Sequence, residues 1–389
     1  MNTLPNIPLG LYVHIPWCEH KCPYCDFNSH VARQPVSEKT YIQALLNDLA
    51  QDLVNFKDLI GDRSLQSIFV GGGTPSLFAP ESIALLLEGI SQKIGLQDDI
   101  EITLEANPSS VEKDKFQGFV EAGINRLSIG IQSFNEKHLS KLGRIHSAEQ
   151  ALLAAEYARS LEVNFNLDLM FGLPEQSLEQ ALADITQAVR LRPNHLSCYQ
   201  LTIEPNTAFY ASPPPQPESE LLWQMQESLQ TSLAESDYEQ YEVSAYAQAE
   251  SQCKHNLNYW QFGDYLGIGA GAHGKLSHPE SGIIRVWKNK HPKTYQQKCA
   301  DKNGSHIGAV NKVAEQQRAF EFMLNALRLS HGFHANLFER RTFLPLSQVQ
   351  RILDKHQQFN LICIDNDWVR PTQRGKSMID TMLQDYLPE

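Results

Sequence analysis

Strand-like and helix-like segments alternate along the first 235 residues, and this alternation limits the possible folds more than any other feature of the chain. Short apolar runs alternate with longer segments whose apolar residues recur at helical spacing. Parallel neighbouring strands need a crossover between them, usually a helix, so the alternation predicts a parallel sheet. The expected strands cover residues 11–15, 67–70, 100–106, 126–131, 164–170 and 195–203. The expected helices begin near Ser37 and Pro80 and then cover 111–122, 147–161, 177–191 and about 218–235.

The number of strand–helix units favours an open barrel over a closed one. A closed parallel barrel needs eight units, and this run is shorter. We therefore predict an α/β fold with a partial (β/α)6 barrel, and a doubly wound sheet is the alternative that fits the same pattern. The barrel is expected to occupy residues 1–237.

The rest of the chain is expected to form two further parts. Residues 238–305 are rich in glycine and aromatic side chains and are interpreted as a connecting region. Residues 306–389 are expected to form a mainly helical C-terminal module. Its pattern of helix, helix, hairpin and helix resembles a winged helix, with segments at 314–327, 346–355, 361–371 and 372–386.

Three cysteines follow the first expected strand with the spacing C-x3-C-x2-C. Cys18, Cys22 and Cys25 can hold three irons of a 4Fe-4S cluster and leave the fourth iron open to a small molecule. A zinc site is the alternative, with a fourth ligand from a nearby histidine such as His14, but structural zinc usually uses paired C-x2-C elements. The other four cysteines are scattered along the chain, which indicates a reducing compartment and no disulfide framework.

Polar or glycine positions also follow the later strands. A glycine run, Gly71–Gly73, directly follows the second expected strand, Glu105 and Gln132 end the third and fourth, and Asp168 lies late in the fifth. Carboxyl ends of parallel strands meet at one rim of a barrel, where active sites are found. The sequence therefore predicts a ligand site at the rim that carries the cysteines.

These residues resemble the radical S-adenosylmethionine (SAM) superfamily. In that family SAM chelates the open iron, and the reduced cluster cleaves it by one-electron chemistry. The resemblance implies a 4Fe-4S cluster on Cys18, Cys22 and Cys25. It also implies SAM contacts from Tyr12, Gly72, Gly73, Thr74, Glu105, Gln132, Arg144 and Asp168.

Longer motifs are similar to the coproporphyrinogen-dehydrogenase-like branch of that superfamily, which contains both porphyrinogen oxidases and heme chaperones. They include 12–18, 128–134, 142–146 and 168–174. The oxidases have a fourth cysteine where this chain has Phe27, and a longer segment ahead of the cluster. Residues 255–260 match the H-N-x-x-Y-W pattern of the chaperones, in which His255 is a candidate heme ligand. A packed structural loop is the alternative interpretation of this motif.

The resemblance implies a heme chaperone that binds the cluster, SAM and heme and passes heme to a membrane-associated respiratory acceptor. Two alternatives stay open: an oxygen-independent coproporphyrinogen III oxidase, and a radical SAM enzyme that acts on RNA or another large substrate.

Composition bears on partners and location. The net charge of −12 argues against nucleic acid as a partner. No apolar stretch approaches the roughly 20 residues of a membrane span, and the first ten residues lack the features of a signal peptide. We expect a cytoplasmic protein that is not integral to a membrane.

Overall fold

A twelve-stranded mixed sheet organises the computed structural model, which describes residues 7–109, 113–301 and 305–388. Its strand order is β14-β13-β12-β11-β1-β4-β5-β6-β7-β8-β10-β9. The six central strands from β1 to β8 are parallel to one another. They are β1 (Leu9–Ile15), β4 (Leu65–Gly72), β5 (Leu96–Ala106), β6 (Arg126–Gln132), β7 (Asn164–Phe171) and β8 (His195–Gln200).

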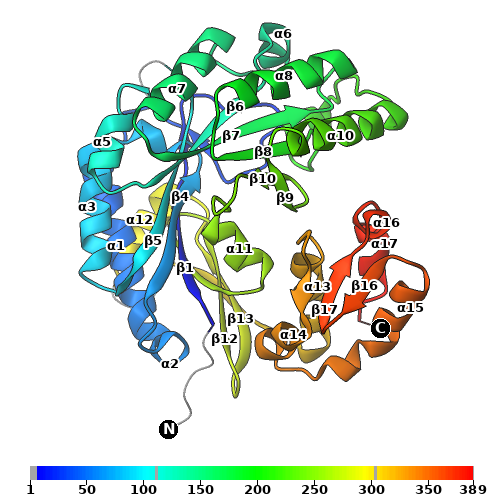
Figure 1. Ribbon diagram of the computed structural model, residues 1–389. Helices are drawn as coiled ribbons and strands as arrows, with labels where there is room; N and C mark the ends of the chain where they lie inside the picture. Colours follow the sequence, from blue (N-terminus) through cyan, green and yellow to red (C-terminus); the bar gives the residue numbers. More distant parts are fainter. Residues whose placement is uncertain (1–6, 110–112, 302–304, 389) are drawn as a thin grey trace.

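Helices follow each of the six parallel strands and cover the outer face of the curved sheet (Figure 1). This arrangement confirms the predicted partial (β/α)6 barrel. The covering helices are α1 (Glu38–Asn55), α3 (Pro80–Ser91), α5 (Phe116–Glu121), α6 (Glu136–Lys141), α7 (Ala148–Ser160), α8 (Leu178–Arg190) and α10 (Ser219–Ala234). The predicted start of one helix at Val111 lies outside the described residues. Ser147 and Ser177 begin α7 and α8 with complete capping boxes, which explains why the sequence marks these starts well.

Much of the stretch 238–305 extends the sheet, which the sequence did not indicate. On one side β11 (Asp264–Ile268) pairs parallel with β1, and an antiparallel meander of β12 (His273–His278), β13 (Gly282–Lys288) and β14 (Ile307–Val313) continues it. On the other side β10 (Ala245–Ala247) and β9 (Glu239–Glu242) add antiparallel to β8. Two helices, α11 (Lys254–Trp260) and α12 (Pro292–Cys299), lie between these strands in sequence. The domain boundaries stay a prediction.

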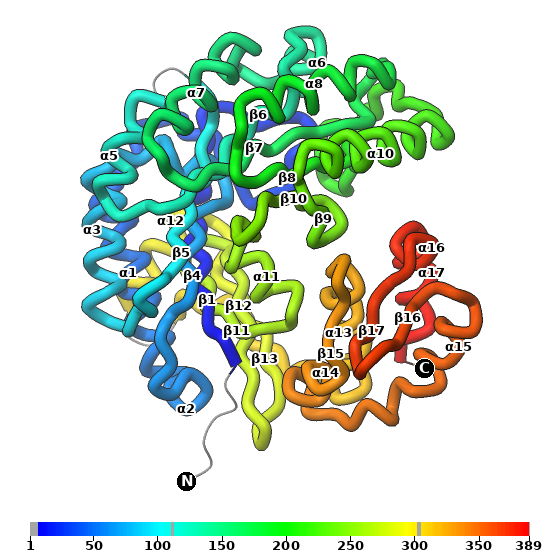
Figure 2. Tube along the Cα trace, in the orientation of Figure 1, coloured from blue at the N-terminus to red at the C-terminus, as the bar shows by residue number. Residues whose placement is uncertain are grey.

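The C-terminal module combines helices with a three-stranded sheet, and Figure 2 shows it beside α11 and the β12–β13 hairpin. The predicted hairpin is present as β16 (Ile362–Asp365) and β17 (Trp368–Pro371), joined by the unpredicted β15 (Phe333–His334). The helices are α13 (Glu315–Ala326), α14 (Ala335–Thr342), α15 (Gln350–Gln358), α16 (Gln373–Lys376) and α17 (Ile379–Gln384). The prediction missed α14, and it was wrong to run the last helix unbroken from 372 to 386. Phe262 and Ile283 join the core of the module, so it packs on the main sheet.

Side chains alternate between the two faces of each parallel strand. In β6, Leu127, Ile129 and Ile131 belong to the core packed under the helices, whereas Arg126, Ser128, Gly130 and Gln132 line the barrel interior. The same alternation recurs in β7, where Leu167 and Leu169 pack in the core and Asn166, Asp168 and Met170 face inward. The interior is therefore an open cavity lined by both polar and apolar side chains, and the polar ones come from alternate positions of the strands.

Candidate functional site

A cavity of about 330 Å³ opens inside the barrel below the cysteine loop. Ten of the residues predicted from the sequence line it, and two do not. The lining residues are Cys18, Cys22, Cys25, Gly72, Gly73, Thr74, Glu105, Gln132, Arg144 and Asp168. Tyr12 and His255 lie outside this lining. The side chains come from five different strands or the loops after them, so only the folded barrel brings them together.

A short parallel pair of strands closes the cysteine loop at its base. β2 (Trp17–Cys18) pairs with β3 (His30–Val31), so residues 19–29 form one loop over the cavity. The Sγ of Cys22 lies 3.7 Å from Nη1 of Arg144, and the Sγ of Cys25 lies 3.8 Å from the hydroxyl of Ser29. Burial raises the pKa of Cys18 and of Cys25. A metal that binds the thiolates offsets this cost.

Cys18, Cys22 and Cys25 are the ligands that the sequence predicts for a 4Fe-4S cluster, and in a cubane each of them would bind a different iron. Among the described residues, the group whose ligand atoms all lie within 4.8 Å of one another is Asp48, Asp52 and His306. Phe27, where the oxidases have a fourth cysteine, is 58% exposed at the mouth of the cavity.

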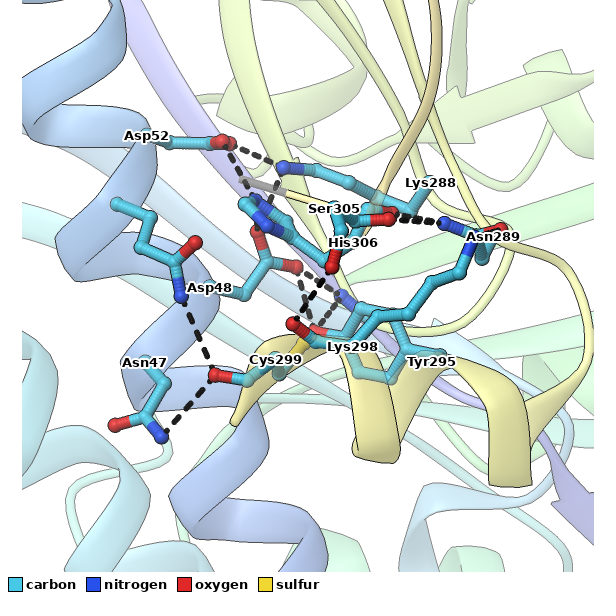
Figure 3. Close-up of polar contacts among 12 residues, drawn as sticks. Asn47, Asp48, Asp52, Lys288, Asn289, Tyr295, Lys298, Cys299, Ser305 and His306 are labelled. Atoms are coloured by element: carbon cyan, nitrogen blue, oxygen red, sulfur yellow. Dashed lines mark hydrogen bonds and ion pairs between the residues drawn. The ribbon is translucent and has the colours of Figure 1, made fainter. Parts of the chain in front are cut away.

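The group formed by Asp48, Asp52 and His306 is already occupied by a lysine. The Nζ of Lys288 donates to both carboxylates at 2.6 Å, in the space that a cation would take (Figure 3). Although burial opposes its charged form, Asp48 and Asp52 hold the pKa of Lys288 above the ordinary value. The hydroxyl of Tyr295 donates to Asp48 at 2.5 Å. This buried network joins α1 to α12 and β13, and we interpret it as structural.

The glycine run brings backbone close to a buried carboxylate. The N–H of Gly72 donates to Oε2 of Glu105 at 3.0 Å. Gly72 has a φ of +116°, and a Cβ on Gly73 would lie 2.5 Å from the carbonyl oxygen of Trp17, so both positions require glycine. Burial, with a further contribution from Asp168, raises the pKa of Glu105 to about 7, although the hydrogen bond from Gly72 opposes the shift. Glu105 is thus an acceptor whose charge changes near neutral pH.

The guanidinium of Arg144 is held in place beside the cysteine loop. Nη2 of Arg144 donates to Oδ1 of Asn107 and to the carbonyl oxygen of Gly130, both at 2.8 Å. Its buried Nε has no hydrogen-bond partner in the described chain. Gln132, at the end of β6, has a φ of +69°, a conformation that non-glycine residues rarely adopt and that is concentrated at functional sites.

The floor of the cavity contains residues that the sequence analysis missed. Asp168 accepts hydrogen bonds from Nδ2 of Asn166 at 2.8 Å and from the hydroxyl of Ser128 at 3.1 Å. Burial raises the pKa of Asp168. Arg126 and Tyr199 also line this region. A polar residue at every second position of the predicted strands was the signal that could have identified them.

Tyr12 and His255 pack together beside the cavity. The phenol of Tyr12 lies 3.1 Å from Nδ1 of His14, and its ring stacks on Phe69. The ring of His255 lies 5.1 Å from that of Phe69, and its Nδ1 is 3.0 Å from the hydroxyl of Ser67. Burial lowers the pKa of His255 to about 4, so the imidazole is neutral at physiological pH.

Helix α11, which carries the H-N-x-x-Y-W motif, separates two hollows. Asn256 lines the barrel cavity, whereas Tyr259 lines a second groove of about 750 Å³ with Tyr265 and Trp287. Glu101 holds the start of the helix, since it accepts hydrogen bonds from the N–H groups of Lys254 and His255, each at 3.0 Å. The motif therefore contacts both hollows.

Among the described residues, no helix is both long and apolar enough to cross a bilayer.

Comparisons with known proteins identify the family and the fold. The Radical SAM superfamily model matches residues 12–187, and the HemN C-terminal domain model matches residues 313–377. A solved structure of coproporphyrinogen III oxidase (HemN) from Escherichia coli superposes with a TM-score of 0.80 over 98% of this chain and 90% of that one, at 22% identity. It shows the shared fold.

Relatives in sequence cover the entire chain. The heme chaperone HemW of Haemophilus influenzae is 50% identical over 390 residues, and that of Escherichia coli is 45% identical over 390 residues. Each alignment spans 100% of both proteins. With the radical SAM and HemN C-terminal models both matched, the chain belongs to the HemW family of the radical SAM superfamily.

Proposed function

We propose that this protein is a cytoplasmic heme chaperone that binds a 4Fe-4S cluster, SAM and heme and passes heme to a membrane-associated respiratory acceptor. The observation that carries the proposal is the full-length identity of 50% to a protein named heme chaperone HemW. The alignment covers all of both proteins, so it includes the residues of the cavity and the motif in α11.

Cys18, Cys22 and Cys25 would hold the cluster, which supplies one-electron chemistry at its open iron when bound with SAM. Two residues that line the cavity have groups that suit the functional groups of SAM. Arg144 offers a fixed guanidinium to the carboxylate of SAM, and Glu105 offers a carboxylate to hydroxyl donors such as those of ribose. The remaining SAM contacts, from Tyr12, Gly72, Gly73, Thr74, Gln132 and Asp168, stay predictions.

Heme would bind next to α11. It would face the barrel side of the helix, where its flat apolar surface suits the aromatic side chains that line the cavity, Phe69 and Tyr199. His255 stays the predicted axial ligand. Its Nδ1 is engaged by Ser67, which leaves Nε2 to bind iron, and the neutral imidazole is the form that ligates metals. Because His255 packs under Tyr12 and Phe69, ligation there requires those rings to move.

The alternative function, oxidative decarboxylation of coproporphyrinogen III, is favoured by one observation, the HemN fold. Phe27 counts against it, because the oxidases have a cysteine at this position. An anaerobic assay of the reduced, cluster-containing protein with SAM and coproporphyrinogen distinguishes the two. We expect no protoporphyrinogen, and stoichiometric loss of two carboxylates would establish the oxidase instead.

Heme titration of the purified full chain, followed by visible absorption, tests the chaperone proposal. We expect a saturable spectrum from the wild type. His255→Ala should change the spectrum, whereas the exposed His331→Ala should not. No saturable heme binding by the wild type would refute the proposal. A spectrum of His255→Ala identical to that of the wild type would refute only the ligand assignment.

A further inference from the structure

A buried guanidinium whose Nε has no hydrogen-bond partner among the described residues lies on the floor of the barrel. Arg126 is 2% exposed and lines the cavity. This Nε is buried, and the guanidinium forms no ion pair within the part of the chain that the structure describes. Because a buried charge without a partner is costly, such groups are normally paired or bound to a ligand.

The nearest acidic groups are committed elsewhere. Glu101 accepts hydrogen bonds from the start of α11 and from the thiol of Cys253 at 3.3 Å. Asp168 accepts from Asn166 and Ser128. Both carboxylates favour the charged form of Arg126 from a distance, but neither accepts a hydrogen bond from its N–H groups. The guanidinium thus keeps donors available on the side of the cavity.

The position of Arg126 separates it from the cluster end of the site. It is the first residue of β6 and Gln132 is the last, with Ser128 and Gly130 between them on the same inner row. At about 3.3 Å per residue, Arg126 lies roughly 20 Å along the strand from Gln132. Arg144, by contrast, contacts Cys22 at the rim. The cavity therefore has one arginine at each end. The carboxylate of SAM would bind Arg144, which leaves Arg126 without a ligand.

A second buried arginine shows that an unpaired nitrogen is not sufficient for this inference. Nε and Nη1 of Arg341 are also buried without partners. Arg341 lies in α14 and lines neither the barrel cavity nor the second groove. Arg126 differs because it faces space that a ligand can enter.

We propose that Arg126 binds a carboxylate of a second ligand that occupies the barrel below the SAM site. The planar fork of N–H donors in arginine matches the two oxygens of a carboxylate. In the proposed function, on which this inference rests for its ligand, the carboxylate is a propionate of heme. Arg126 is then a binding residue that selects ligands bearing an acid group.

The test compares two forms of the ligand in three forms of the protein. Heme and heme dimethyl ester, whose propionates are neutral, are titrated into the cluster-reconstituted full chain, Arg126→Gln and Arg126→Lys. We expect the wild type to bind heme about 10- to 100-fold more tightly than the ester, as for loss of a charged hydrogen-bonded pair. Arg126→Gln should abolish this preference, and Arg126→Lys should retain part of it. The exposed Arg374→Gln is the control for the same chemical change.

Two further measurements make each outcome decisive. SAM affinity, measured by equilibrium dialysis, should be unchanged in Arg126→Gln, and a loss there would overturn the proposal in favour of a SAM contact.

Propionate itself is the heme-independent probe, detected by saturation-transfer NMR. If the wild type binds propionate through Arg126 but does not bind heme, the chaperone function fails and the carboxylate site stands. If Arg126→Gln keeps the wild-type preference for heme and binds propionate equally, the inference is refuted. Should the glutamine variant not fold, the lysine variant carries the comparison.

Discussion

Among single side chains, Glu105 links the site most directly to pH. Its pKa of about 7 lies above the value of 4.5 for an exposed glutamate, because burial disfavours the carboxylate. The folded protein therefore protonates Glu105 as the pH falls through about 7, and it loses a charged acceptor. We predict that SAM binding weakens, by up to about tenfold, as the pH falls from about 8 to about 6. Isothermal titration across this range measures it.

The variant Glu105→Gln identifies the group responsible. It should bind SAM weakly at every pH in that range, because the amide does not ionise. A pH dependence that persists in Glu105→Gln would assign the effect to another group, of which Asp168 is the neighbour with a raised pKa.

The cysteines give the second prediction for single side chains. Cys22→Ser should lose most of its bound iron and its cluster absorption after anaerobic reconstitution, because only three thiolates are available to the cluster. Cys363→Ser, an exposed cysteine of the C-terminal module, should keep the wild-type iron content. Four irons per chain in Cys22→Ser would contradict the ligand assignment.

At the level of helices and strands, Lys288 joins β13 to α1. Lys288→Met leaves Asp48 and Asp52 buried without their cation, and we predict a loss of about 3–5 kcal/mol in the free energy of unfolding. Denaturant titration measures the loss. Lys290→Met, two residues along the chain and exposed, should have little effect. The cost should shrink when Asp52→Asn is already present, and an unchanged cost would show that the pair does not act together.

The start of α11 depends on one carboxylate. Glu101→Gln weakens the acceptor for the N–H groups of Lys254 and His255, and we predict destabilisation by about 1–3 kcal/mol. Those two amides should also exchange hydrogen faster. Asp98→Asn, exposed on the same strand, is the matched control. If exchange at α11 is unaltered, Glu101 does not hold the helix.

At the level of the whole molecule, the C-terminal module completes the core of the main sheet. Phe262 and Ile283 pack with the module, and Arg285 on β13 pairs with Glu321 on α13 at 2.7 Å. A chain that ends at residue 313 would expose these apolar side chains, so we predict that it aggregates or unfolds at lower temperature than the full chain. Calorimetry should show one cooperative transition for the full chain. A truncated chain as stable as the full one would contradict this.

The sequence by itself determined the local elements of the barrel and the order of its ligating groups. Helical periodicity, capping residues and glycine runs depend on neighbours within a few positions, and these identified the six strand–helix units and the cysteine motif. Only the tertiary structure decided how residues 238–305 are used, because strand pairing at a sheet edge depends on partners far along the chain. The meander from β11 to β14, for example, joins the sheet through β1, more than 250 residues earlier. The burial of Arg126 at the floor of the cavity also depends on partners far along the chain. Arg126 is one polar residue among many in the sequence, and it becomes an unpaired buried charge only when the surrounding strands have closed around it.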